Sequence, residues 1–233
     1  MPKGEIMESK YYFHRVQWMG VIGMALLCLI CGCWMPQVYS TASSKSISLG
    51  PDDLERYGVA FITPSTVTGQ EEEKQSVALV FADVLVKERP AVRCITLPET
   101  LNAVNKAGLS EKYKLMYVEY SNTGIFSRDV LQQLGNVTTA RYVAQLKLSG
   151  FQQGTDGRFS AFGLRVIGTK SASLRLFFQI WDTNEGSIAW EGVEELQYST
   201  DDVLEKSITL RKVMEVAAKN MISRLPKDMA VRP

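Results

Sequence analysis

The hydrophobic pattern of the chain changes near residue 140. Before that point, short apolar runs alternate with stretches of helical periodicity, whereas after it apolar and polar residues alternate with a period of two. The first part predicts strands at 59–62 and 92–95 and helices at 71–87, 98–106, 110–120 and 127–134. Gly135 is expected to end the last of these helices, because glycine favours helix C-termini.

The second part predicts an antiparallel meander. Alternating apolar positions mark strands at 141–151, 171–181 and 187–196, and the turn Asp182–Gly186 joins the last two. Residues 152–170 are rich in glycine and polar residues, which predicts a long loop or an irregular hairpin.

A helix is predicted to close the chain. Asp202 and Glu205 have the spacing of a capping box, so the helix is expected to start there and to end near Leu225, before a proline. Its apolar positions form one stripe that should pack on the sheet: Leu210, Val213, Met214, Ala217 and Met221. The predicted fold class is therefore α/β (α+β), a mixed sheet of about five strands with an antiparallel C-terminal meander, packed by helices that include a C-terminal amphipathic helix.

Residues 1–32 have the pattern of a secretion signal. Lys3, Lys10 and Arg15 give a positive head, and an apolar core follows from Trp18. That core is shorter than the roughly 20 residues that a membrane-spanning helix needs. We expect this segment to be removed; the alternatives are an uncut N-terminal membrane helix and a cytosolic protein with an apolar start.

The end of the apolar core carries the most specific motif in the chain. Ile30, Cys31, Gly32 and Cys33 resemble the bacterial lipobox, which has a branched aliphatic residue at −3 and a small residue at −1. The resemblance implies that Cys33 receives a diacylglycerol and becomes an acylated N-terminus (a palmitate-type anchor). Because Trp34 rather than aspartate follows, we expect attachment to the outer membrane, facing the periplasm, with inner-membrane anchoring as the alternative.

The segment after Cys33 is predicted to be a tether. Residues 33–50 are rich in serine and threonine and have no apolar period, so a disordered, lipidated tether is expected. Residues 51–233 are then expected to form a single globular domain.

Charge and chemistry narrow the function. The chain has 26 basic and 25 acidic residues, of which residues 1–32 contain three and two. The rest of the chain therefore has equal numbers of basic and acidic residues. Because it carries no net charge, no nucleic-acid partner is expected. The single histidine, His14, precedes Cys33, and no phosphate-binding or nucleophile-elbow motif is present. No catalytic residue, metal site or cofactor is therefore predicted. Cys94 is interpreted as a small buried apolar residue, with a reactive thiol as the alternative.

Two groups of residues have a functional interpretation as well as a structural one. The carboxylates at Asp156, Glu191, Glu194 and Glu195 could form an acid pair, and Glu71 to Glu73 could bind a cation. Solvated charges and complementarity to the helix dipole are the preferred interpretations.

Aromatic residues near the meander turn are the second group with two interpretations. Trp181, Trp190 and Tyr198 either pack in the core or form an exposed recognition surface.

Three segments in this order resemble a family of envelope lipoproteins that includes CsgG, LpoB and the N-terminal domain of TolB. They are 59–62, 134–143 with the strand beyond it, and 174–191. The resemblance implies a single CsgG/TolB-N-like domain, held at the membrane by its lipid, that acts as a non-enzymatic binding or scaffold module for a protein partner in the envelope.

Two other functions remain open. One is a subunit of an oligomeric outer-membrane secretion assembly, although glycines interrupt the alternation that membrane-inserted hairpins need in 152–170. The other is a carboxylate hydrolase. The sequence leaves the oligomeric state and the identity of the partner open.

Overall fold

The structure is a computed structural model that describes residues 36–67, 69–161, 164–202 and 208–227. For 155–161, 164–168 and 201–202 only the backbone is described. The helices and strands are β1 (Gln37–Ser46), α2 (Asp53–Tyr57), β2 (Val59–Phe61), β3 (Ser65–Thr66), α3 (Glu71–Glu88), β4 (Cys94–Ile95), α4 (Leu97–Lys106), α5 (Ser110–Thr123), α6 (Arg128–Thr138), β5 (Tyr142–Ala161), β6 (Leu164–Asp182), β7 (Ser187–Asp202) and α7 (Leu210–Ser223).

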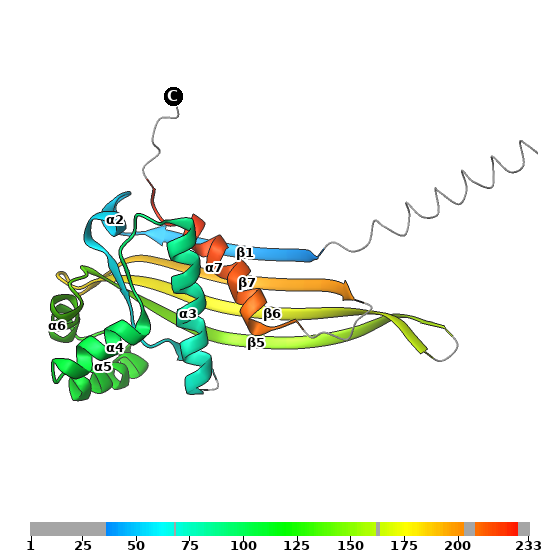
Figure 1. Cartoon of the computed structure of the whole chain (residues 1–233), viewed down its shortest axis with the longest axis horizontal. Helices are drawn as coiled ribbons and strands as arrows, with labels where there is room; N and C mark the ends of the chain where they lie inside the picture. Colours follow the sequence, from blue (N-terminus) through cyan, green and yellow to red (C-terminus); the bar gives the residue numbers. More distant parts are fainter. Residues whose placement is uncertain (1–35, 68, 162–163, 203–207, 228–233) are drawn as a thin grey trace, which may run out of the picture.

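The described strands form one mixed sheet in the order β1-β7-β6-β5-β2-β4, with β3 also paired to β5. Strands β5, β6, β7 and β1 are antiparallel neighbours, whereas β2 pairs in parallel with both β5 and β4. Helices α3 and α7 lie side by side across one face, and α4, α5 and α6 gather at one end of the sheet (Figure 1). The predicted fold class is confirmed.

The two faces of the sheet contribute to two separate hydrophobic clusters. On β6, Leu174, Leu176 and Phe178 point to the cluster that α3 and α7 cover. Trp181 lies in the other cluster, with residues of α4, α5 and α6. The pairing of β6 with β7 shifts register between Ile180 and Trp181, where both residues are buried, each in a different cluster.

The segment predicted to be a tether contains a strand. β1 pairs antiparallel with β7 over its whole length, and the amides of Ile47 and Leu49 then donate to Ala189 O at 2.9 and 3.1 Å. The prediction of a disordered segment up to residue 50 is therefore wrong for 37–46. The sequence pattern does not predict this strand, because its residues are mostly polar on both faces and the strand is stabilised by backbone hydrogen bonds to β7.

The prediction of a long loop at 152–170 is wrong, and the alternative of an irregular hairpin is confirmed. β5 and β6 remain paired as far as Ala161 and Leu164. Register shifts fall at Leu148/Gly150 and at Gly157/Phe159. Gly157, one of the glycines that interrupt the alternation in 152–170, thus lies at an irregularity of a continuous ladder.

The predicted end of α6 at Gly135 is also wrong, because the helix continues to Thr138. A Cβ atom at Gly135 would lie 2.4 Å from Oγ1 of Thr183, in the turn between β6 and β7. This glycine permits close packing instead of ending a helix. The left-handed residue that caps α6 is Thr139, with φ of 57°.

The predicted capping box at Asp202 is wrong as well. Asp202 is still in β7, where it pairs with Gly168, and Glu205 lies outside the described residues. α7 starts instead after Thr209, whose hydroxyl accepts from the amide of Lys212 at 3.3 Å. The predicted apolar stripe of this helix is confirmed: Val213, Met214, Ala217 and Met221 are buried and Leu210 is half-buried.

Gly192 on β7 gives a test of how tightly the α7 side of the sheet is packed. A Cβ atom there would lie 2.6 Å from the Trp190 ring and 3.1 Å from the Met221 methyl group. We expect Gly192→Ala to lower the free energy of unfolding by about 1–3 kcal/mol, since both neighbours must move. Urea denaturation measures this change.

Gly150→Ala is the matched control, because no atom lies within 4 Å of the added methyl group and Gly150 has no positive φ. We expect it to change the free energy of unfolding by less than about 0.5 kcal/mol. Equal effects of the two substitutions would contradict the packing described for Gly192.

Candidate functional site

The sheet has a face without helical cover over β1, β7, β6 and β5, opposite α3 and α7, and we call it the open face. Its side chains come from alternate positions, and the strand register aligns them in four rows across the strands. These rows are Tyr39–Gln197–Ser173–Gln152, Thr41–Glu195–Arg175–Gly150, Ser43–Val193–Phe177–Lys147 and Lys45–Glu191–Gln179–Gln145.

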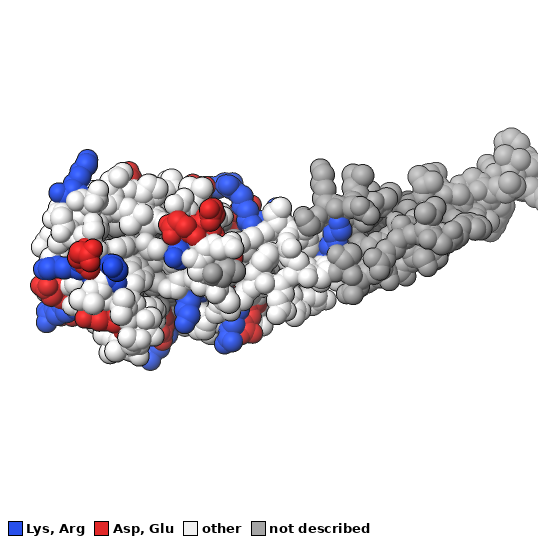
Figure 2. Space-filling model, turned by 90° about the horizontal axis from the view of Figure 1, so that it is seen from below, with Lys and Arg blue, Asp and Glu red and all other residues white. Residues whose placement is uncertain are grey.

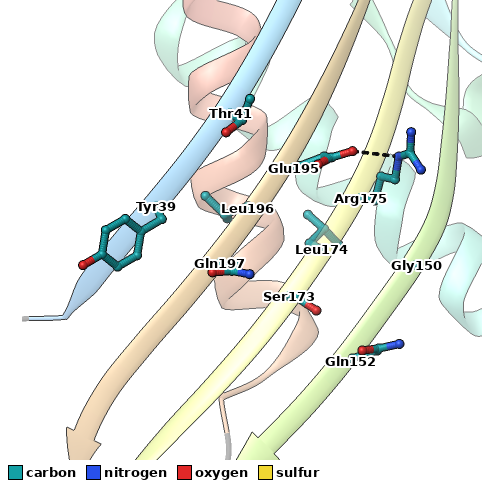
Figure 3. A pocket seen from close by; sticks show the side chains of 10 residues that line it. All are labelled: Tyr39, Thr41, Gly150, Gln152, Ser173, Leu174, Arg175, Glu195, Leu196 and Gln197. Atoms are coloured by element: carbon teal, nitrogen blue, oxygen red, sulfur yellow. Dashed lines mark ion pairs between the residues drawn. The ribbon is translucent and has the colours of Figure 1, made fainter.

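The open face is hollowed rather than flat. A groove of about 520 Å³ is lined by residues from all four strands, among them Tyr39, Gln152 and Gln197 (Figure 3). A second hollow of about 470 Å³ lies between Lys45 of β1 and Phe177 of β6. The two hollows follow the same strands, so the open face offers one extended surface and not an enclosed pocket.

The open face carries charges of both signs. Arg175 Nε and Glu195 Oε1 form an ion pair at 3.1 Å, with both side chains exposed (Figure 3). The guanidinium of Arg175 also lies 5.4 Å from the centre of the Phe177 ring. Acidic and basic side chains alternate over the described part of another side of the molecule (Figure 2). The open face, which carries charges of both signs, suits a partner that also carries charges of both signs.

The buried Gln145 and several half-buried polar groups border the open face where α5 meets the sheet. Tyr120 donates to Gln179 Oε1 at 3.2 Å, and Gln145 Nε2 donates to Ser65 Oγ at 3.3 Å. Gln145 is 1% exposed, and its Oε1 has no hydrogen-bond partner. An orphan acceptor of this kind costs free energy unless water or a ligand reaches it.

Two tyrosines of α5 make hydrogen bonds to Thr63, where the Tyr113 hydroxyl accepts from the backbone amide and the Tyr117 hydroxyl donates to the backbone carbonyl. Tyr117 donates to the carbonyl of Thr63 at 2.7 Å, and Tyr113 lies 2.9 Å from the amide and the hydroxyl of the same residue. Burial raises the pKa of Tyr113 and Tyr120, and raises that of Tyr117 well above its usual value. These phenols therefore stay protonated at neutral pH and hold the chain after β2 in place.

Trp181, Trp190 and Tyr198 do not form a recognition surface. Their exposed fractions are 2%, 1% and 8%. Trp190 packs edge-on against Phe178 in the cluster under α3 and α7, whereas Trp181 contacts Phe126 on the opposite face. Of the two interpretations of these residues, packing in the core is the one that the burial supports.

The carboxylates named from the sequence are dispersed. Glu191 and Glu195 belong to the open face, but Glu194 points to the opposite side and is fully buried. The side chain of Asp156 lies outside the description. Glu71 pairs with Lys74 at 3.7 Å at the start of α3. Within the residues that the structure describes, no group of three or more His, Cys, Asp or Glu side chains is placed to hold a metal ion.

Glu194 has a structural task at the edge of the sheet. Its Oε1 accepts from Ser40 Oγ of β1 at 2.5 Å and from Asn220 Nδ2 of α7 at 2.9 Å, while Oε2 is buried without a hydrogen-bond partner. The carboxylate thereby joins β1 to the helix that covers the sheet. This link holds a strand that has little apolar contact of its own.

The lipobox residues Ile30, Cys31, Gly32 and the proposed lipid carrier Cys33 lie outside the described residues. The first residue of β1, Gln37, is the fourth after Cys33. None of the described helices is long and apolar enough to cross a membrane.

A surface groove between α3 and α4 was not predicted. It has a volume of about 580 Å³ and a largely apolar lining that includes Leu79, Leu97 and Leu101. Leu79 is 51% exposed. No motif in the sequence marks this groove, because α3 and α4 form its lining together only in the folded chain.

No protein-family model and no curated protein matches the chain. Solved structures with similarity include the PelC dodecamer from Paraburkholderia phytofirmans, at 15% identity and a TM-score of 0.41, covering 83% of this chain and 99% of that one. Lipoprotein GNA1162 from Neisseria meningitidis has 11% identity and a TM-score of 0.36, covering 72% and 98%. The LpoB C-terminal domain from Salmonella enterica has 13% identity and a TM-score of 0.33, covering 64% and 84%.

Cys94 provides a test of the chemistry on β4. Burial, followed by the nearby charges of Glu99 and Asp83, raises the pKa of its thiol to about 12. The thiolate is the reactive form, so at pH 8 we expect modification by iodoacetamide about a thousandfold slower than for a free cysteine. The rate should keep rising tenfold per pH unit up to pH 10. Peptide mapping by mass spectrometry measures it, and a rate that levels off below pH 9 would contradict this environment.

Proposed function

We propose that this chain is a lipid-anchored envelope protein, attached through Cys33 to the outer membrane and facing the periplasm. In this proposal the open face binds a protein partner, and the chain has no catalytic activity. The position of β1 is the observation that carries the proposal, because this one strand follows the lipobox and also forms the border of the open face.

The short connection between the anchor and the sheet sets the distance to the membrane. Four residue steps separate Cys33 from Gln37, and they span at most about 14 Å when fully extended. An acylated Cys33 therefore keeps the open face close to the bilayer surface. A partner on this face would be held there too, which suits a scaffold.

The chemistry of the open face supports binding more than catalysis. Arg175 and Glu195 form an exposed ion pair on this face, in which each charge neutralises the other. Glu194, the neighbour that could have completed an acid pair, points away from it. A surface of hydroxyls, amides and balanced charges has the general polarity of a non-obligate protein interface.

A second candidate function is a subunit of an oligomeric outer-membrane secretion assembly. The observation that favours it is the long β5–β6 hairpin. Gln37 of β1 is level with Ser199, Ser171 and Gly154, and the hairpin continues past this level to Ala161 and Leu164. The hairpin projects from the end of the sheet at which β1 begins.

Substitution of Cys33 tests the anchor. We expect Cys33→Ser to abolish the diacylglyceryl mass on the protein from its native host and to move it from the membrane fraction to the soluble periplasmic fraction. Intact-mass spectrometry and fractionation measure both changes. Cys31→Ser is the matched control, since serine is also small and Cys31 is removed with the signal; it should retain the lipid. Unchanged mass and partitioning in Cys33→Ser would overturn the proposed anchor.

Photo-crosslinking in native-host cells tests the open face. We expect a photoreactive amino acid at Gln197 or Ser173 to give one discrete heterologous adduct, because both positions line the groove. The same probe at Lys87, exposed on α3, should give none. An added Glu195→Lys should reduce the adduct at Gln197 by at least threefold.

Two outcomes would contradict this prediction. Adducts at twice the mass of the chain would support the secretion-assembly function instead. Equal adducts from Lys87 would argue against a binding site on the open face.

A further inference from the structure

β1 forms one edge of the sheet, and the structure places nothing beyond it among the described residues. It pairs with β7 on one side only, in register from Gln37–Ser199 to Ser46–Trp190. Figure 1 shows the strand at the border of the sheet with its outer side free of other described elements. An antiparallel strand directs alternate amides and carbonyls to each side, so the outer edge carries a row of unpaired backbone groups.

This edge lacks the features with which proteins protect exposed strands. β1 has no proline, its pairing with β7 shows no register shift, and Lys45 is its single charged residue. The opposite edge of the sheet differs, because β4 there has only two residues, Cys94 and Ile95. A long, regular and nearly uncharged edge is the arrangement that accepts another strand.

We propose that β1 is a docking edge for an extended segment of the protein partner, which adds to the sheet as a further strand beside β1. This inference rests on the proposed function and deepens it, because it names how the partner of the open face engages. An added strand would extend each of the four rows of the open face by one side chain.

The residues of β1 define the chemistry of the segment. Near the start of the strand Val38 and Tyr39 are 42% and 65% exposed, which favours an apolar or aromatic residue beside them. At the other end Lys45 favours a carboxylate at the same level. Between them lie small serine, threonine and alanine side chains that set few steric limits. The matching segment is therefore extended, acidic at one end and apolar at the other.

A second copy of this chain fits the edge less well. Two β1 strands related by a two-fold axis must pair antiparallel, so their Gln37 ends would lie about 34 Å apart at opposite ends of the pair. The two lipid-bearing ends would then leave in opposite directions, although each has at most about 14 Å of chain before its sheet strand. A heterologous partner strand meets no such constraint.

A synthetic peptide tests the docking edge directly. The probe is a capped ten-residue peptide of alternating threonine and valine, with phenylalanine near one end and glutamate near the other. We expect it to protect those amides of residues 37–46 that face away from β7 from hydrogen exchange in the mature lipoprotein in detergent micelles. Lys45→Glu should weaken binding of this peptide about fivefold and strengthen binding of its lysine-for-glutamate counterpart by a similar factor.

Two controls make the result specific to the edge. Lys147→Glu, on β5 at the far side of the open face, should leave both affinities unchanged. A peptide with proline at alternate positions should give no protection. No protection of β1 at saturating probe, equal protection by the proline peptide, or equal effects of Lys45→Glu and Lys147→Glu would overturn the docking edge. Protection of β1 that rises with protein concentration alone would overturn it in favour of a second copy.

The full chain with Cys33→Ser separates this inference from the proposed anchor. If mass spectrometry finds no lipid on the native protein but the peptide protects β1 in both forms, the anchor fails and the docking edge stands. If the lipid is present and neither form shows protection, the docking edge fails and the anchor stands.

Discussion

The register of the β5–β6–β7 ladder is the constraint on which the rest of the molecule depends. Because successive side chains point to opposite faces, the ladder sends Leu174 and Leu176 into the cluster under α3 and α7, and sends Ser173 and Arg175 to the open face. A slip of one residue would exchange the two sets, burying an arginine and exposing two leucines. The core and the candidate binding surface are thus two results of one alignment.

Polar contacts fix this alignment at the turn before β7 and near the middle of β7. At the turn before it, Asp182 Oδ2 accepts from Arg141 Nε and Nη2 at 3.0 and 2.8 Å, and Oδ1 accepts from the amide of Asn184 at 2.9 Å. Asp182 is buried, so these contacts compensate the loss of water around its charge. Further along β7, Glu194 fixes β1 and α7 against the sheet. The apolar clusters supply most of the stabilisation, whereas these two carboxylates select the register.

Elements with one apolar face could be predicted from the sequence, and elements without one could not. The strand 171–181 and the stripe of α7 were predictable because their apolar residues recur with periods of 2 and 3.6. β1 was not, since it is polar on both faces and depends on β7, a partner about 150 residues away. For the site, the sequence pointed to the tryptophans at 181 and 190, which the two clusters bury. The open face has no motif, because its residues come from four strands and meet only through the register.

The proposed anchor would have a mechanical consequence for this fold, because it would be attached to an edge strand. A pull on a lipid at Cys33 would act along β1, at right angles to the hydrogen bonds that join it to β7, and would therefore load the whole row of bonds together instead of one after another. The link from Ser40 through Glu194 to Asn220 would pass part of that load to α7. Burying the Glu194 carboxylate without a cationic partner among the described side chains costs free energy, and its hydrogen bonds to β1 and α7 offset part of that cost. The same strand can then be firmly held on its inner side while its outer side stays available to a partner.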